Sequence, residues 1–168
     1  MRIGLSALLC MAMLMGCGYQ LAGRGDLPGG IQTIAVQVLE NRSSQTGAEI
    51  TFTNALINEL NRRRRGSVVQ TGRADATLNG TIESISWDTV SRSGANTATE
   101  RRVYASLSLT LTDHAGNVLW RRSGLAAEQA YGVVDGDKTA TENNRRLAIN
   151  LLSEQMAEYV YRRLTDNF

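Results

Sequence analysis

The sequence predicts an α+β domain in which two helices pack on one face of a mixed four-stranded sheet, in the chain order β-α-β-β-β-α. Two segments, near 48–60 and 147–160, repeat apolar residues at the helical period. Four other segments alternate apolar and polar residues as strands do, and the last three follow one another as in an antiparallel meander. The first strand should join the sheet in parallel, through a right-handed crossover.

The N-terminal segment has the pattern of an export signal that ends in a cysteine. Arg2 precedes an apolar run from Ile3 to Met15, and Gly16-Cys17 follows. The ending Leu-x-Gly-Cys resembles the lipobox of bacterial lipoproteins, whose cysteine is acylated. We therefore expect a signal peptide at 1–16 and a lipid anchor at Cys17, with several acyl chains to hold the protein on a membrane.

Two alternatives to a lipoprotein signal are a transmembrane helix and an ordinary cleaved signal with an incidental cysteine. The apolar run is too short for a span, which needs about 20 residues. Gly18 follows the cysteine, where an Asp would resemble an inner-membrane retention signal in the best-studied bacterial lipoproteins. Its absence favours the outer membrane.

The composition beyond the signal indicates one domain without thiol chemistry. The glycine-rich segment 17–30 predicts a flexible tether, and 31–168 has the size of a single domain. Cys10 falls in the signal and Cys17 carries the lipid, so no cysteine remains for a disulfide, a metal or a nucleophile. All basic residues except Lys138 are arginines, which suit phosphate recognition, although a GC-rich genome would also favour arginine.

The first strand and first helix follow the tether. Apolar residues at 34, 36 and 38 predict a strand with one buried face. The helical stripe that begins at Ala48 ends in Arg62 to Arg65 and Gly66, a basic last turn followed by glycine, as helix C-termini favour. The arginine run therefore has a structural explanation, and the competing hypothesis of a nucleic-acid patch is disfavoured for an exported protein.

The middle of the chain predicts a long hairpin. Residues 67–70 could form a very short strand, and a strand from Ala74 changes phase after Ile82, which indicates a β-bulge near Gly80. We expect a polar loop over 91–100. The clearest strand comes next, with one buried face made of Val103, Ala105, Leu107, Leu109 and Leu111.

The last strand and the last helix complete the order. A turn over 113–117 leads to a strand over 118–131, and a glycine-rich loop follows it. Thr139 and Glu142 have the spacing of a capping box, with Arg145 among the outward positions of the helix. The predicted apolar stripe of this helix consists of Leu147, Ala148, Leu151, Leu152, Met156, Tyr159 and Val160.

The sequence contains few residues suited to catalysis. His114 is the one histidine and lies in a predicted turn, away from the positioned partner that an acid or base needs. No set of His, Cys, Asp and Glu has metal-ligand spacing, and Asp135 and Asp137 make only a fragment of a calcium loop. We expect no catalytic residue, no metal and no cofactor, and therefore a binding or assembly protein.

The chain after the signal peptide carries a family resemblance over nearly its whole length. Cys17-Gly18-Tyr19-Gln20-Leu21-x-Gly23, then Leu27-Pro28, a strand, a helix, Ala74-Asp75-Ala76 and the meander resemble the LPS-assembly lipoprotein family LptE. The resemblance implies a lipoprotein anchored on the periplasmic face of the outer membrane. It also implies two partners, lipopolysaccharide and the β-barrel LptD, and no nucleic acid.

The resemblance also implies candidate contacts with lipopolysaccharide. The family's basic residue between the second and third strands corresponds to Arg92, and its basic residue before the last helix falls near Lys138. Arg101 and Arg102 are added from their charge and their place across the same hairpin. A periplasm-facing structural lipoprotein that engages peptidoglycan or a secretion machine is the alternative function, and a hydrolase that depends on His114 comes third.

Overall fold

The computed structural model describes residues 27–92, 94 and 98–166. The predicted signal peptide, Cys17 and most of the predicted tether lie outside these residues. The described chain contains η2 (Pro28–Gly30), β1 (Ile34–Val36), β2 (Glu40–Asn41), α2 (Ala48–Arg63), η3 (Thr71–Arg73), β3 (Ala76–Arg92), β4 (Ala98–Asp113), β5 (Val118–Gly132) and α3 (Lys138–Thr165).

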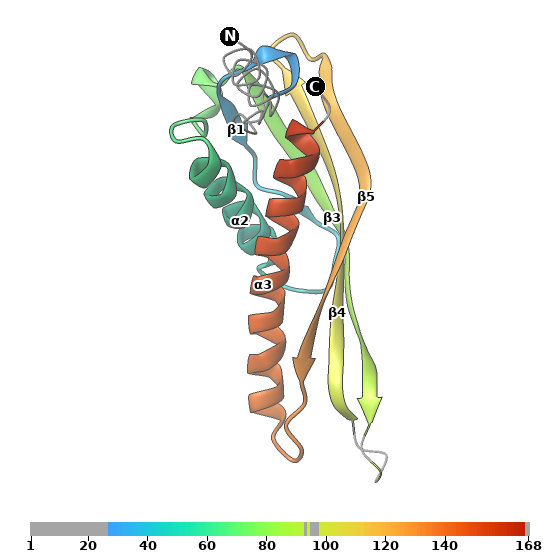
Figure 1. Ribbon diagram of the computed structural model, residues 1–168. Coiled ribbons are helices and arrows are strands. Elements are labelled where there is room, and N and C mark those ends of the chain that lie inside the picture. The colour runs from blue at the N-terminus through green and yellow to red at the C-terminus, as the bar shows by residue number, and fades with distance from the viewer. Residues whose placement is uncertain (1–26, 93, 95–97, 167–168) are drawn as a thin grey trace, which may run out of the picture.

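The predicted α+β fold is confirmed. The sheet has the order β1-β3-β4-β5, with β1 parallel to β3 and the other pairs antiparallel, and the two-residue β2 also pairs with β3 in parallel. Both helices lie on the same face of the sheet (Figure 1). Neither helix of the described chain has an apolar stretch long enough to cross a membrane.

The molecule is elongated and its two ends differ (Figure 1). We call one end the base: α2, β1, β2, and the parts of β3, β4, β5 and α3 beside them. The other end, the tip, comprises 86–92, 98–104 and 128–146; there the sheet is covered by the first turns of α3 alone. The described chain begins at Leu27 in the base, and α3 also ends there.

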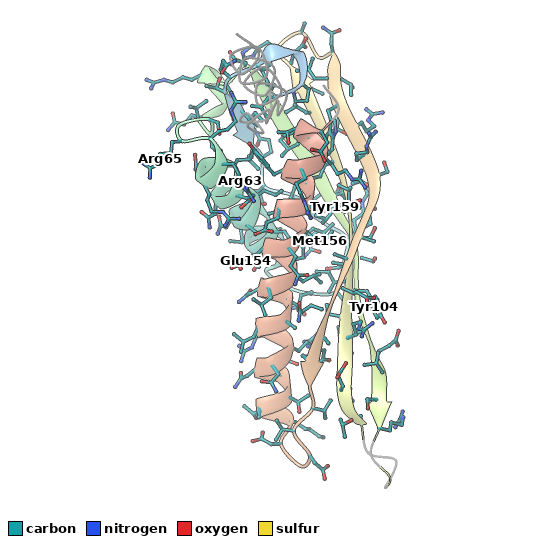
Figure 2. All side chains as sticks on the ribbon, viewed as in Figure 1. Arg63, Arg65, Tyr104, Glu154, Met156 and Tyr159 are labelled. Atoms are coloured by element: carbon teal, nitrogen blue, oxygen red, sulfur yellow. The ribbon has the colours of Figure 1, made fainter. Side chains whose placement is uncertain are left out.

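The predicted buried face of β4 forms the centre of the core. Val103, Ala105, Leu107, Leu109 and Leu111 are all buried, and they pack in one cluster with both helices. Alternate residues of β4 on the opposite face are polar and only half-buried. Tyr104 is one of them, and Figure 2 shows it on the side of the sheet away from the helices.

The predicted bulge is present in β3. The pairing with β4 shifts between Ile82 and Ser84, so that Ile82 and Ile85 can both be buried despite their odd spacing. Gly80 lies beside Leu109, and a Cβ on Gly80 would fall 2.8 Å from the carbonyl oxygen of Ser108. The two strands therefore approach each other closely at this glycine.

Several local predictions in the first half of the chain differ from the structure. Val38 is 60% exposed, because β1 ends at Val36 and the chain instead buries Leu39, whose N–H donates to the Thr53 hydroxyl at 3.0 Å. Residues 67–70 form only a single bridge, between Val68 and Ile34. Leu27 is buried in the core and belongs to the packed domain, although the composition of 17–30 predicts a tether.

The hairpin loop and the start of α3 also differ. The strands extend into the predicted loop, β3 to Arg92 and β4 from Ala98, because cross-strand pairing continues through these polar residues. The predicted capping box is wrong: Asp137 is the N-cap and its carboxylate accepts from the Ala140 N–H at 2.9 Å. The helix begins two residues earlier than the capping box predicts, and the Asp137 carboxylate satisfies the free N–H of Ala140.

The face that α3 buries is rotated from the predicted stripe. Leu147 is 60% and Leu151 50% exposed, whereas Ile149, Ala157 and Leu164 are buried. Arg145, which the pattern places outward, has a side chain only 15% exposed. Apolar residues occupy two sides of this helix, and the sheet packs against the side that continues through Leu152 and Met156.

Candidate functional site

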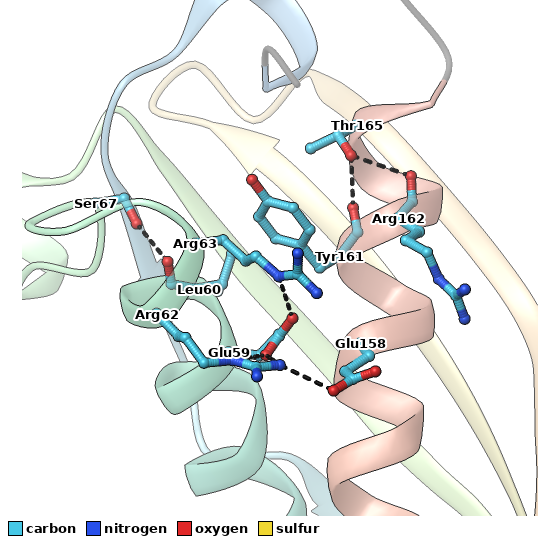
Figure 3. A network of polar contacts seen from close by, with 9 residues as sticks. All are labelled: Glu59, Leu60, Arg62, Arg63, Ser67, Glu158, Tyr161, Arg162 and Thr165. Carbon is cyan, nitrogen blue, oxygen red and sulfur yellow. Dashed lines mark hydrogen bonds and ion pairs between the residues drawn. The ribbon is translucent and has the colours of Figure 1, made fainter. Parts of the chain in front are cut away.

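The base contains a polar network between the two helices (Figure 3). Glu59 is buried in α2 and accepts from both Arg62 and Arg63, and Arg62 also donates to Glu158 of α3 at 2.9 Å. The Arg63 guanidinium lies 5.7 Å from the centre of the Tyr161 ring. These arginines are engaged within the fold, so the structure supports the structural explanation of the arginine run.

The tip contains a cleft between the sheet and the first turns of α3. Its volume is about 480 Å³. Trp87 of β3, Arg101 of β4 and Tyr131 of β5 line it from the sheet. The remaining lining residues come from the loop after β5 and from α3: Val133, Val134, Asp135, Gly136, Asp137, Lys138, Thr141, Glu142 and Arg145.

Strand register brings the sheet side of the cleft together. Trp87 is opposite Val103, and Tyr131 is opposite Arg101. Because side chains alternate along a strand, Arg101 shares the helix-facing side with the buried Val103. The sequence separates these residues widely, and only the meander register places them in one wall.

Hydrogen bonds hold the loop wall of the cleft against α3. The Thr141 hydroxyl accepts from the Val134 N–H at 2.9 Å, and the Asn144 amide donates to the Gly132 carbonyl at 2.9 Å. The Val133 N–H donates to the carbonyl of Thr99 at 3.0 Å, which ties the same loop to β4. The cleft is therefore formed before any ligand binds, which lowers the entropy cost of binding.

The charged side chains of the cleft differ in whether they have partners among the described residues. Arg145 donates to Glu142 through Nε at 2.9 Å and Nη2 at 2.6 Å, and these bonds lower the pKa of the Glu142 carboxyl. Asp137 is engaged as the N-cap of α3. Within the described part of the chain, neither Arg101 nor Lys138 forms a salt bridge.

The structure separates the four predicted lipopolysaccharide contacts. Arg101 and Lys138 line the cleft. Arg102 lies on the other face of β4, where its Nη1 donates to Glu128 at 2.8 Å. Arg92 is exposed at the end of β3, outside the lining of the cleft.

Sequence reasoning missed Trp87, Tyr131 and Arg145 as site residues. The Arg145 guanidinium lies 4.2 Å from the centre of the Trp87 ring, a cation–π contact. Three isolated side chains on three elements carry no local pattern. The one available signal was an aromatic residue in each of the two strands that flank β4, Trp87 in β3 and Tyr131 in β5.

The described residues contain no cluster of metal-ligating side chains. His114 is exposed in the turn after β4, in the base, whereas the cleft lies in the tip. Asp135 and Asp137 have no further acidic or histidine neighbours that would complete a metal site within the described chain.

Comparisons with known proteins agree with the fold. The model of a family described as LptE, lipopolysaccharide-assembly, matches residues 31–164. The solution structure of uncharacterized lipoprotein B from Nitrosomonas europaea is similar, with a TM-score of 0.61, 14% identity, and coverage of 88% of this chain and 90% of that one. The crystal structure of rare lipoprotein B from Shewanella oneidensis has a TM-score of 0.55 and 15% identity, and the match covers 76% and 93% of the two chains. A search of curated proteins finds no match.

Proposed function

This chain belongs to the lipopolysaccharide-assembly family LptE, and on that premise we propose that it is an outer-membrane lipoprotein that binds lipopolysaccharide and acts as the plug and assembly partner of an LptD β-barrel. It has no catalytic role in this proposal. The observation that carries the proposal is the cleft at the tip, where two cations, Arg101 and Lys138, line one preformed cavity and form no salt bridge with any described residue.

The cleft and its surroundings suit a phosphorylated glycolipid. Arginine and lysine bind phosphate by charge-assisted hydrogen bonds, which are about twice as strong as neutral ones. Arg92, exposed at the end of the neighbouring strand, supplies a further cation at the same end of the molecule. Three apolar side chains of the tip, Trp87, Val90 and Val134, are also partly exposed, and a lipid could contact them there.

The sheet supports a barrel as the protein partner. Both helices lie on one face, and the other face of β4 presents Tyr104, Ser106, Ser108, Thr110 and Thr112 without a covering layer of described residues. The interior of an outer-membrane barrel is polar. A rigid sheet with polar and half-buried side chains is a suitable surface to fill it.

The anchor remains part of the proposal. Cys17 would carry the lipid and hold the protein at the periplasmic face of the outer membrane, with 1–16 removed as the signal peptide. The described chain enters the fold at Leu27 in the base, so the cleft lies at the end away from this attachment.

The experiment pairs co-purification with charge reversal. The full chain, extracted in detergent, should co-purify with a large outer-membrane barrel and bind lipopolysaccharide. Arg92→Asp combined with Lys138→Asp should weaken that binding while the melting temperature stays nearly unchanged, because surface substitutions usually alter stability by less than about 0.5 kcal/mol. Arg73→Asp, an exposed arginine of η3 in the base, is the matched control.

Three results would count against this function. A chain that purifies without a barrel and without lipopolysaccharide binding contradicts it directly. Capture of peptidoglycan or secretion components would favour the structural lipoprotein instead. Loss of folding together with binding in the double variant would mean that these two cations are structural.

A further inference from the structure

Two buried polar atoms have no hydrogen-bond partner in the described chain, and both belong to the cleft at the tip. They are the hydroxyl of Tyr131 and Nη1 of Arg145. A buried donor without a partner is destabilising, since it has lost its hydrogen bonds to water and gained none. Because both atoms belong to residues that line one cleft, an acceptor group bound there could satisfy both of them.

Arg145 is held so that Nη1 is its one guanidinium nitrogen without a hydrogen-bond partner among the described residues. Glu142 occupies Nε and Nη2, and the ring of Trp87 covers the plane at 4.2 Å. The side chain is 15% exposed. A guanidinium that is fixed in this way loses little side-chain entropy when Nη1 binds a ligand.

Tyr131 is placed as firmly from the sheet side. It is 6% exposed, and β5 pairs it directly with Arg101 of β4. A buried tyrosine hydroxyl usually finds a hydrogen-bond partner. In this cleft the described residues leave it without one, next to a cation that has no salt bridge.

The lining also limits the kind of ligand. Asp135 and Asp137 are carboxylates in the same cleft as Arg101, Lys138 and Arg145. A bare anion would meet these carboxylates unfavourably. A sugar phosphate suits the mixed lining, because its phosphate oxygens accept hydrogen bonds and its hydroxyl groups donate them.

We infer that Tyr131 and Arg145 form a binding site for a sugar-phosphate group in the cleft, with Arg101 and Lys138 beside it. We call this binding site the seat. This inference rests on the proposed function, since the phosphorylated sugar would be the head of the bound glycolipid. Trp87 and Glu142 are positioning residues, because they hold the Arg145 guanidinium and leave Nη1 to the phosphate.

In the test, glucosamine 1-phosphate, glucosamine and inorganic phosphate are each titrated into the full chain in a non-ionic detergent. Binding is measured from the NMR chemical shifts of the protein. Tyr131→Phe removes only the hydroxyl, and Arg145→Lys keeps the charge but loses the fork. Each should weaken glucosamine 1-phosphate binding about tenfold or more, because a hydrogen bond to a charged group is lost. Arg163→Lys is the matched control, since Arg163 lies 5.1 Å from the ring centre of Tyr159 in the base.

The melting temperature distinguishes a binding role of Tyr131 and Arg145 from a purely structural role. Tyr131→Phe should leave the melting temperature of the unliganded chain unchanged or higher, because it deletes a buried hydroxyl without a partner. A lower melting temperature with unchanged binding would overturn the inference, as the hydroxyl would then serve only the fold. Equal binding of glucosamine and its phosphate, or no binding of either, would also overturn it.

The outcomes for lipopolysaccharide distinguish this inference from the proposed function. If lipopolysaccharide binds equally well to wild type, Tyr131→Phe and Arg145→Lys, the seat is wrong and the function stands. If glucosamine 1-phosphate binds as expected but neither lipopolysaccharide nor a barrel does, the seat stands and the function is wrong. Binding of inorganic phosphate alone, without preference for the sugar phosphate, contradicts the assigned ligand class.

Discussion

The base and the tip share the strands β3, β4 and β5 and the helix α3, yet they differ in what their side chains do. In the base, α2 and β1 complete a core where Leu78, Leu107 and Leu111 have no exposed surface. In the tip, Trp87, Val90 and Val134 remain 40 to 43% exposed. The base also exposes apolar side chains, Val38, Ile50 and Val118, so the ends differ not in apolar surface but in the deep two-helix core of the base and the cleft of the tip.

The difference arises from the length of one element. α2 is shorter than α3 and lies beside only its C-terminal part. The first turns of α3 therefore pack on the sheet without a second helix beside them (Figure 1). Polar contacts replace apolar packing there, chiefly Arg145 with Glu142 and Trp87. Substitutions should consequently affect stability in the base and binding in the tip.

The largest effect is expected from Leu109→Ala, which opens a cavity in the base. Leu109 is 1% exposed at the centre of β4, and a buried leucine replaced by alanine costs about 2 to 5 kcal/mol. Urea unfolding measures this loss. The matched control Leu147→Ala removes the same atoms from an exposed position of α3 and should cost less than about 0.5 kcal/mol. Similar losses for both would contradict the division between core and surface.

Gly80→Ala should cost less, about 1 to 3 kcal/mol, through overpacking. The added Cβ would lie 2.2 Å from Cδ2 of Leu109 and 2.8 Å from the Ser108 carbonyl oxygen, and a backbone atom cannot easily move away. Thermal unfolding is the measurement. Gly132→Ala in the tip, where a Cβ meets no atom within 4 Å, is the control and should be nearly neutral. A neutral Gly80→Ala would mean that the two strands are not so close.

A smaller effect is expected from Asp75→Asn, and it depends on pH. The Gln32 N–H, then the hydroxyl and N–H of Thr33, hold the pKa of the Asp75 carboxyl below its usual value. A lowered folded pKa stabilises the fold above the unfolded pKa, and this contribution disappears as the pH falls through the folded pKa.

The difference in free energy of unfolding between wild type and Asp75→Asn should therefore shrink as the pH falls from about 5 to about 2. Urea unfolding at a series of pH values measures the two curves. Curves that stay parallel over this range would show that the Asp75 charge does not join β1 to β3.

The smallest effect is expected from Arg102→Gln. Arg102 lies in the tip but on the sheet face away from the cleft, in an exposed pair with Glu128. Exposed salt bridges contribute about 0 to 1 kcal/mol. Lipopolysaccharide binding, measured by titration, should stay unchanged, whereas Arg101→Gln should weaken it. Equal losses in the two variants would show that charge in the tip matters and the cleft does not.

The sequence predicted the fold well because the fold depends on periodicity. The alternation in β4 and the change of phase after Ile82 are local patterns, and both correspond to observed burial and pairing. Gly80 was identifiable for the same reason. In α3 the pattern failed at Leu147 and Leu151, because apolar residues on two sides of a helix do not reveal which side a sheet will cover.

The cleft was only half predictable. Arg101 could be selected by its charge and its place in the hairpin, and Lys138 by the family resemblance, and both line the cleft. Trp87, Tyr131 and Arg145 could not, since their proximity depends on the register of three strands and on the rotation of α3. The face of Arg102 was predictable, because alternation from the buried Val103 places Arg102 with Tyr104 on the opposite face of β4.

The most direct test uses the chain's two tryptophans, one at each end. Trp87 lines the cleft, and Trp120 is buried in the base, with its indole N–H donating to the Arg163 carbonyl at 3.2 Å. The two indole N–H signals can be followed by NMR while lipopolysaccharide is added to the full chain in detergent. Our account predicts that the Trp87 signal shifts with lipopolysaccharide concentration and that the Trp120 signal stays in place. A shift of Trp120 with Trp87 unchanged would contradict it.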